Sequence, residues 1–481
     1  MNKSHDKPME AGGAQSAAPA ARGGHNPAHV WLVSFVAALG GLLFGYDWVV
    51  IGGAKPFYEK FFHLTNPDAQ GWAMSCALIG CMAGATLSSM ACDRWGRKRM
   101  LITAAALFTV TSLGTALAGS FGVFIAWRIA GGAAIGLASI ISPLYIAEIA
   151  PARMRGRLVS LNQFTIVIGI LLAQVVNWLI AEPVPAGATA RQILESWNGQ
   201  AGWRWMFGVT AIPSVLFLAG AFFVPESPRW LVARGRLAEA GKILGRIGGA
   251  AHAQAAIADI AETIKSARAG ANFSELFNPK LRRVLVLGIT LAVVQQWCGI
   301  NVIFNYAENI FSEAGYDIST VLKNIAWTGS VNLVFTIVAL GVVDRRGRRP
   351  LMLFGFAGLA VIYIAMGLCY HTGVQGLPML LLVLAAIACY AMSLAPVTWV
   401  VISEIFPNRI RGAAMAVSVA ALWFGCFTLT YTFPLLNSAL GASGTFWLYA
   451  GICAAGFVFI RARLPETKGR TLEQIEKELA G

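Results

Sequence analysis

Charged side chains are scarce in this chain of 481 residues: Asp, Glu, Lys and Arg make up 12% of it, whereas 57% of the residues are hydrophobic. About a quarter of the residues of a soluble globular protein are charged, so the composition excludes that class. Acids are the scarcer kind, and the formal net charge is +14. In so apolar a chain, the excess of Lys and Arg indicates basic cytoplasmic loops rather than nucleic-acid binding.

Several chemical signatures are also missing. The eight cysteines form no CxxC pair and no cluster with His, which argues against a metal site or a disulfide framework. No GxxxxGK[ST] phosphate loop occurs, so an ATP-driven pump is not expected. Residues 1–29 are polar and lack the apolar core of a signal peptide, and we expect a disordered cytoplasmic tail there. We therefore expect no enzyme, no cofactor and no metal.

Long apolar runs are what the chain has in abundance. Twelve runs are long enough to cross a bilayer as helices, and they lie at about 30–53, 70–91, 100–119, 122–149, 157–180, 204–224, 282–312, 321–343, 350–371, 377–405, 411–437 and 443–464. A polar stretch with two amphipathic helical patterns, 225–280, divides them into six and six. The predicted fold is an all-α membrane protein of twelve transmembrane helices with short cytoplasmic helices.

Short motifs in the loops recur between the two sets of six spans. DRWGRKR (93–99) returns as DRRGRRP (344–350), EIAPARMRG (148–156) as EIFPNRIRG (404–412), and VPESPRW (224–230) as LPETKGR (464–470). Matched motifs in the same order indicate a duplication, and six spans per unit make the two halves parallel repeats. The expected domains are the tail 1–29, an N-terminal half 30–224, a cytoplasmic helical linker 225–280, a C-terminal half 281–464 and a cytoplasmic helix 465–481.

The recurring loops also predict the orientation of the chain. DRWGRKR and DRRGRRP each carry four basic residues against one acid, and they lie on the same side as both termini. The opposite side is poor in Lys and Arg. The positive-inside rule therefore places both termini in the cytoplasm, and we expect a multi-pass protein of the cell's inner (plasma) membrane.

One ionisable side chain, Asp47, lies in the first apolar run. A carboxylate at the bilayer centre costs about 2.5–3.5 kcal/mol, so its default interpretation is functional, with a partner of opposite charge. Arg128 in the fourth span is that partner, because both side chains lie about 9 Å below the outer end of their spans. We predict that Asp47 and Arg128 couple transport to protons. The alternative is a pair that only holds two helices together.

The seventh span contains four amides within eleven residues, Gln295, Gln296, Asn301 and Asn305. Burying amides without partners is costly, whereas amides match the hydroxyls of a sugar. Gly299 lies among them and would let the helix break, as helices of transporters do at the midplane. The alternative is hydrogen bonding between helices.

The motifs DRWGRK, DRRGRR, PESPRWL, QQWCGIN and PETKGRTLEQIE together resemble those of the sugar porters of the major facilitator superfamily, over about residues 30–480. FGYD and LASIISPLYIAEIAP look most like the bacterial D-xylose:proton symporters. The resemblance implies two six-helix repeats around a central site that binds a monosaccharide, which is imported with a proton by alternating access. The sugar ligands that it implies are Phe44, Gln163, Gln295, Gln296, Asn301, Asn332, Trp399 and Trp423.

The sequence departs from the family pattern at three places. Ala395 replaces the usual Gly before Pro396, Leu422 replaces the usual Gln or Asn before Trp423, and Asn305 replaces the first Tyr of a Tyr-Tyr pair. The pattern that reads hydroxyls in the C-terminal half is therefore altered. The substrate stays open among a pentose such as xylose, a hexose and a polyol.

Charged side chains gather at the predicted cytoplasmic ends of the spans: Asp93, Arg97, Glu148, Arg155, Glu226, Arg229, Asp344, Arg348, Glu404 and Arg411. Acids contribute little to topology. We therefore expect a charge network that holds the two halves together when the site faces outward. The alternative is a topology signal alone.

Two other functions remain as alternatives, a facilitative sugar uniporter and a transporter-like sugar sensor. Facilitators of this family typically carry Asn where Asp47 stands. A sensor needs a cytoplasmic output domain, whereas the tails here are only about 29 and 17 residues long. We expect a monomer whose partners are a monosaccharide, a proton and the lipid bilayer, with no nucleic acid. With one acid inside the spans, we expect one proton per sugar.

Overall fold

The structure, a computed structural model, describes residues 27–151, 153–185, 187–268, 279–407, 410–468 and 474. The side chains of Ser89, Asp344, 266–268 and 279–280 are outside that description. Most of the predicted tail 1–29, part of the linker 225–280 and most of the C-terminal helix 465–481 also lie outside the described residues.

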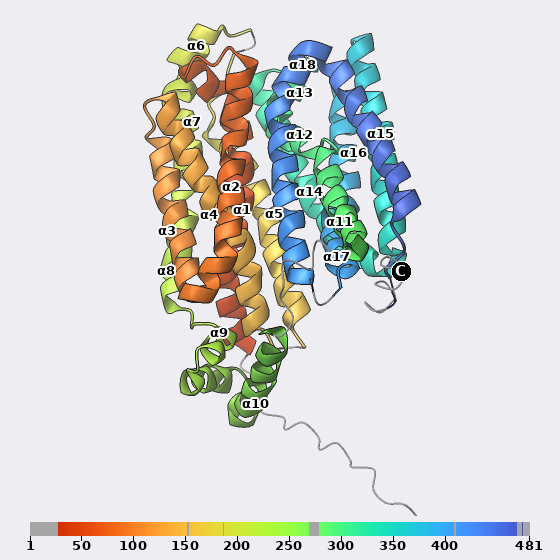
Figure 1. The fold of residues 1–481 in the computed structure, drawn as a ribbon. Coiled ribbons are helices and arrows are strands. Elements are labelled where there is room, and N and C mark those ends of the chain that lie inside the picture. The colour runs from red at the N-terminus through yellow and green to blue at the C-terminus, as the bar shows by residue number, and fades with distance from the viewer. Residues whose placement is uncertain are drawn as a thin grey trace, which may run out of the picture.

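The helices of the N-terminal half run side by side (Figure 1). They are α1 (Pro27–Phe61), α2 (Pro67–Trp95), α3 (Arg97–Ala116), α4 (Phe121–Ile149), α5 (Arg155–Ile180), α6 (Ala190–Glu195), the π-helix η1 (Asn198–Gly202), α7 (Trp203–Gly208) and α8 (Ala211–Phe223). Below them lie α9 (Pro228–Ala233) and α10 (Leu237–Arg268). We call the end of the bundle near α10 the inner end, and the opposite end the outer end.

The C-terminal half forms the second bundle in Figure 1. Its helices are α11 (Pro279–Trp297), α12 (Ile300–Asn305), α13 (Ala307–Glu313), α14 (Ile318–Arg346), α15 (Arg348–Thr372), α16 (Leu377–Met392), α17 (Leu394–Ile405) and α18 (Arg411–Arg463). In the described chain, 11 helical segments are long and apolar enough to cross a membrane. The last of them, α18, has 53 residues and turns at Gly441, where φ is 67°, so it contains two of the twelve predicted spans. The all-α fold with twelve spans is confirmed.

Two spans of the C-terminal half are broken. Gly299 adopts a left-handed backbone conformation, with φ of 85°, between α11 and α12, which confirms the predicted break. A second break, at Ser393 between α16 and α17, was not predicted. Its cause is Pro396, because proline has no N–H for the helix and its ring clashes with the carbonyl four residues earlier.

The two halves meet along α2 with α18 and α5 with α14. Hydrogen bonds between the halves include Gln174 Nε2 to Thr328 Oγ1 (3.2 Å), Val184 N to Ser319 Oγ (2.9 Å), Tyr431 OH to Asp68 Oδ1 (3.3 Å) and Lys55 Nζ to Glu308 Oε2 (3.1 Å). All four lie toward the outer end. The structure is therefore closed between the halves on the outer side.

Small residues let the helices of the N-terminal half approach closely. A Cβ added to Gly45 of α1 would overlap the carbonyl oxygen of Ile166 on α5. Helices in membranes pack through such small residues, because lipid provides no hydrophobic driving force for their association. Gly45 lies two residues before Asp47, so this contact fixes the depth and rotation of the carboxylate.

Gly45→Ala should lower stability by about 1–3 kcal/mol, the usual cost of overpacking. The methyl group would separate α1 from α5, and the thermal unfolding temperature of the purified protein in detergent measures the effect. Gly122→Ala is the matched control, because nothing lies within 4 Å of an added Cβ there. Equal unfolding temperatures for the two variants would contradict the close packing of α1 on α5.

Candidate functional site

Asp47 of α1 and Arg128 of α4 form a buried ion pair. Arg128 Nη1 donates to both carboxylate oxygens of Asp47 at 3.1 Å, and Nη2 lies 3.5 Å from the Asp47 carbonyl oxygen. Only 7% of Asp47 and 3% of Arg128 are exposed. The guanidinium also lies over the ring of Phe207, 5.4 Å from its centroid. The two charges that the sequence predicted to pair therefore do so, and each compensates the other away from water.

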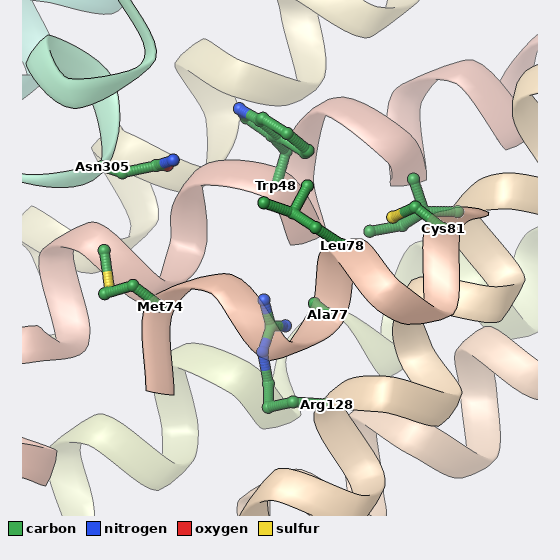
Figure 2. Close-up of a pocket in the computed structure, with 8 residues that line it drawn as sticks. Trp48, Met74, Ala77, Leu78, Cys81, Arg128 and Asn305 are labelled. Carbon is green, nitrogen blue, oxygen red and sulfur yellow. The ribbon is translucent and has the colours of Figure 1, made fainter. Parts of the chain in front are cut away.

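A small cavity opens beside this pair (Figure 2). Arg128 points into it from α4, Trp48 lines it from α1, Met74 and Cys81 line it from α2, and Asn305 reaches it from α12. The first four side chains belong to the N-terminal half and Asn305 belongs to the C-terminal half. The ion pair therefore faces the interface between the halves, next to the broken seventh span.

The break at Gly299 brings together amides that an unbroken helix would separate. Asn301 Nδ2 donates to Gln296 Oε1 and lies 3.3 Å from Cys426 Sγ of α18, while Gln295 Nε2 donates to the Tyr390 hydroxyl of α16. The side chains of Gln295, Gln296, Asn301 and Asn305 are each less than 9% exposed.

Three amide oxygens in this span are buried and accept no hydrogen bond within the described residues: Gln295 Oε1, Asn305 Oδ1 and Asn309 Oδ1. Leaving a buried acceptor unpaired costs about 1–3 kcal/mol. A ligand that donates hydroxyl protons would recover this energy, so the span is poised for a polyhydroxylated solute.

Three aromatic rings, two from the N-terminal half and one from the C-terminal half, pack against one another beside the cavity. The centroids of Phe44 and Trp48 on α1 lie 6.1 and 5.8 Å from that of Trp423 on α18, and 6.2 Å from each other. Trp423 Nε1 is buried and makes no hydrogen bond within the described residues. The cluster therefore offers apolar ring faces and one free donor, which suits the faces and hydroxyls of a sugar.

The other residues implied by the resemblance are placed differently. Asn332 of α14 is buried, with 6% exposed. Gln163 of α5 is exposed, and Trp399 of α17 is 41% exposed, outside the aromatic cluster. None of the sugar ligands implied by the resemblance lines the cavity itself. Phe44 and Trp423 pack against the lining residue Trp48, whereas Gln163 and Trp399 are exposed.

Sequence reasoning missed three residues of this region, Trp48, Tyr390 and Cys426. Trp48 follows Phe44 by four positions, so helical spacing places both on one face of α1 and was a usable signal. Tyr390 and Cys426 meet the amides only because α16 and α18 pack against α11 and α12, and no local pattern reveals that contact.

At the inner end, each half holds its own charge network. Arg97 Nη2 donates to Glu148 Oε1 at 3.0 Å, and Arg97 Nε lies 2.9 Å from Glu148 Oε2. Arg97 Nη1 reaches Asp93 at 3.3 Å, while Glu226 accepts from the backbone N–H of Arg97 at 2.8 Å. The C-terminal half repeats this arrangement. Arg348 donates to Glu404 at 3.1 Å, and Glu466 accepts from the backbone N–H of Arg348 at 3.0 Å.

The remaining members of the predicted network are less engaged. Arg411 donates to the Phe406 carbonyl oxygen at 3.3 and 3.2 Å, Arg155 begins α5 and Arg229 lies in α9. The side chain of Asp344 lies outside the described residues. In this conformation the described pairs stay within one half, so a network that joins the halves stays a prediction for the outward-facing state.

Polar groups that meet between two six-helix halves, shielded on one side of the membrane, are typical of secondary transporters. The chain is thus a multi-pass membrane transporter by its fold and the placement of its polar groups. Residues 33–479 match the family model described as "Sugar (and other) transporter", and the chain belongs to that family.

Curated relatives resemble the chain over nearly its whole length. It is 38% identical to a D-xylose-proton symporter of Escherichia coli K12, covering 94% of this chain and 96% of the relative. It is 37% identical to an arabinose-proton symporter of Bacillus subtilis, covering 94% and 96%, and 37% identical to a galactose-proton symporter of Escherichia coli K12, covering 95% and 96%.

Solved structures show the same likeness. The inward open conformation of the xylose transporter XylE from E. coli superposes with a TM-score of 0.82 at 36% identity, covering 94% of this chain and 100% of that one. A XylE structure bound to 6-bromo-6-deoxy-D-glucose gives a TM-score of 0.76 at 37% identity, covering 95% and 100%. The first of these structures is an inward open form, which agrees with the closure between the halves on the outer side.

The buried ion pair predicts a double-mutant cycle. Arg128→Gln removes one partner and leaves the Asp47 charge uncompensated, so it should destabilise the protein by about 3–5 kcal/mol. Asp47→Asn together with Arg128→Gln should be clearly more stable than Arg128→Gln alone, because no lone charge stays buried. Denaturation of the purified variants in detergent measures both. Additive losses would show that the two side chains do not interact.

Proposed function

We propose that the chain imports a monosaccharide together with a proton by alternating access, with Asp47 as the proton carrier. The observation that carries this proposal is the buried Asp47–Arg128 pair, in which Arg128 Nη1 lies 3.1 Å from Asp47 Oδ1. The pair lies beside a cavity that is also lined by Asn305 of the other half. A carboxylate in this position gains or loses a proton where it can alter the contact between the halves.

The ion pair supplies a physical link between proton and conformation. When Asp47 is ionised, its negative charge balances the positive charge of Arg128, and the ion pair holds both side chains in the N-terminal half. Protonation of Asp47 weakens this attraction, so that Arg128 can interact with the groups that line the cavity. Two charge states of one pair therefore favour two arrangements of the halves, which is the differential interaction that a coupled transition needs.

We propose that the sugar lies between the halves. Gln295, Gln296, Asn301 and Asn305 contact its hydroxyls, Asn332 lies nearby, and Phe44 and Trp423 contact its apolar faces. The unpaired oxygens of Gln295 and Asn305 and the unpaired Nε1 of Trp423 support this role. We also retain Gln163 and Trp399 as ligands, since their exposure in the present conformation leaves them free to reach a solute.

The halves 30–224 and 281–464 are proposed to move as units, joined by the linker 225–280. A single chain is the proposed transporting unit, because the cavity takes residues from both halves of one chain. We propose that the protein spans an inner membrane and that both termini lie on its cytoplasmic side. The basic inner end of the bundle then faces the more negative compartment.

Asp47→Asn should abolish uphill accumulation of sugar in proteoliposomes with an imposed proton gradient. Because the variant keeps a polar group in the cavity but binds no proton there, exchange of labelled for unlabelled sugar should persist. D-Xylose, L-arabinose, D-galactose and D-glucose are the probes. Accumulation of sugar against its concentration gradient by Asp47→Asn would refute the role of Asp47. Sugar flux that does not depend on the proton gradient in the unmodified protein would favour a uniporter.

Alanine in place of Gln295, Gln296 or Asn301 should weaken sugar binding by about 1–3 kcal/mol, since each change leaves a hydroxyl without its partner. Calorimetry on the purified protein with the best-bound of the four sugars measures the loss. Gln70→Ala is the control, because this amide donates to the Leu64 carbonyl oxygen at the outer end of α2, away from the cavity. Unchanged affinity in all three variants would remove this span from the binding site.

A further inference from the structure

A second cluster of charges is buried at the outer end of the interface between the halves. Lys55 Nζ lies 3.1 Å from Glu59 Oε2, one turn further along α1, and 3.1 Å from Glu308 Oε2 on α13. Lys55 is 3% exposed and Glu59 is 7% exposed, while the side chain of Glu308 is 13% exposed. We call Lys55, Glu59 and Glu308 the outer triad.

The outer triad carries one acid too many. Two carboxylates share one ammonium group, so full ionisation leaves one negative charge in excess in a place that water hardly reaches. A buried charge without compensation is strongly unfavourable. The structure must therefore provide either another cation or a proton.

The surrounding groups do not supply the missing positive charge. The other charged side chains near the triad are Lys60 on α1, which is partly exposed and forms no ion pair with the triad within the described residues, and Glu313 on α13. Glu313 itself accepts from Asn437 Nδ2 at 2.8 Å. The other titratable groups that face the triad are hydroxyls engaged elsewhere: Tyr58 donates to Met74 Sδ at 3.2 Å, and Tyr306 donates to the Thr430 carbonyl oxygen at 2.8 Å.

The hydrogen bonds identify which carboxylate would hold a proton. Glu308 uses both oxygens, since Oε2 accepts from Lys55 and Oε1 accepts from Ser312 Oγ at 3.3 Å. Glu59 uses only Oε2, and its Oε1 is buried without a hydrogen-bond partner in the described structure. A proton on Glu59 Oε1 neutralises the triad and keeps both bonds of Lys55.

The triad exists only while the outer side is closed. Lys55 and Glu59 belong to the N-terminal half and Glu308 to the C-terminal half, so separation of the halves at this end removes Glu308 and leaves a neutral Lys55–Glu59 pair. We propose that the outer triad is a proton-binding gate: closure of the outer side loads one proton onto Glu59, and opening releases it.

This proton differs from the one assigned to Asp47. It enters from the outer solution on closure and returns to the same solution on opening, so it does not cross the membrane and adds nothing to the proton-to-sugar ratio. Its effect is on the equilibrium between outer-open and outer-closed states. Because closure takes up one proton, acidification of the outer solution favours the closed state. At pH values where Glu59 is ionised in the open state, the ratio of closed to open protein should rise tenfold for each unit of decrease in pH.

The test measures that equilibrium directly in the full chain carrying Asp47→Asn, which removes the other proton-coupled acid. Spin labels at Gly122→Cys and Val374→Cys, exposed sites at the outer ends of the two halves, report the distance across the gate by pulsed electron resonance. The protein is reconstituted in lipid nanodiscs without sugar and titrated from pH 8 to pH 5. The ratio of closed to open protein should rise as the pH falls, with the slope expected for uptake of one proton, a tenfold change per pH unit.

Glu59→Gln and Glu308→Gln should each abolish this slope, because either change leaves the triad neutral without a proton. Glu239→Gln, which removes an acid of the exposed Arg236–Glu239 pair at the inner end, should retain it. A closed population that does not depend on pH overturns the proposal, as does a full slope in Glu59→Gln or in Glu308→Gln. Either variant decides the question if the other fails to fold. Since all variants lack the Asp47 carboxylate, these outcomes are independent of the proposed coupling role of Asp47.

Discussion

A charge inside a bilayer must be matched within the protein, and the arrangement of α1 against its neighbours follows from that constraint. Asp47 and Arg128 satisfy it together, which ties α1 and α4 to one depth and one rotation. The close contact of Gly45 with α5 is compatible with only that rotation. Phe44 and Trp48 then face the same interface, so one ion pair determines where an aromatic surface for a ligand can lie.

Backbone polar groups impose a related constraint. A broken helix in a membrane is tolerated only where the freed groups are buried in protein or face a cavity. The breaks at Gly299 and Ser393 both lie in the C-terminal half, and the helices that they create carry Gln295, Asn301 and Tyr390. The N-terminal half thus supplies the charges near the cavity, and the C-terminal half supplies most of the amides.

Features that depend on local pattern were predictable from the sequence. The spans follow from hydropathy, the repeat from its loop motifs, and the pairing of Asp47 with Arg128 from matched depth in the membrane. The break at Gly299 followed from one residue type. What could not be predicted depends on packing between distant segments: the contact of Tyr390 with Gln295, the contact of Cys426 with Asn301, and the exposure of Trp399 in this conformation.

The end of α1 shows how packing overrides local pattern. The apolar run ends near residue 53, and the following Lys, Pro and Glu residues suggest a loop, yet α1 continues to Phe61. Lys55 and Glu59 are one turn apart, so their pairing favours the helix, and Glu308 completes the burial from the other half. Neither the sequence near residue 55 nor that near residue 308 contains this information alone.

The two ends of the molecule therefore differ in a way that bears on transport. At the inner end the repeat is preserved, and Arg97 with Glu148 has its counterpart in Arg348 with Glu404, each pair inside one half. Such pairs stiffen the halves without favouring either arrangement of them. At the outer end, Lys55 and Glu308 join the halves directly. Contacts that cross the interface change the balance between states, whereas contacts within a half do not. The outer side is thus where substitutions can tune this equilibrium while both halves stay intact.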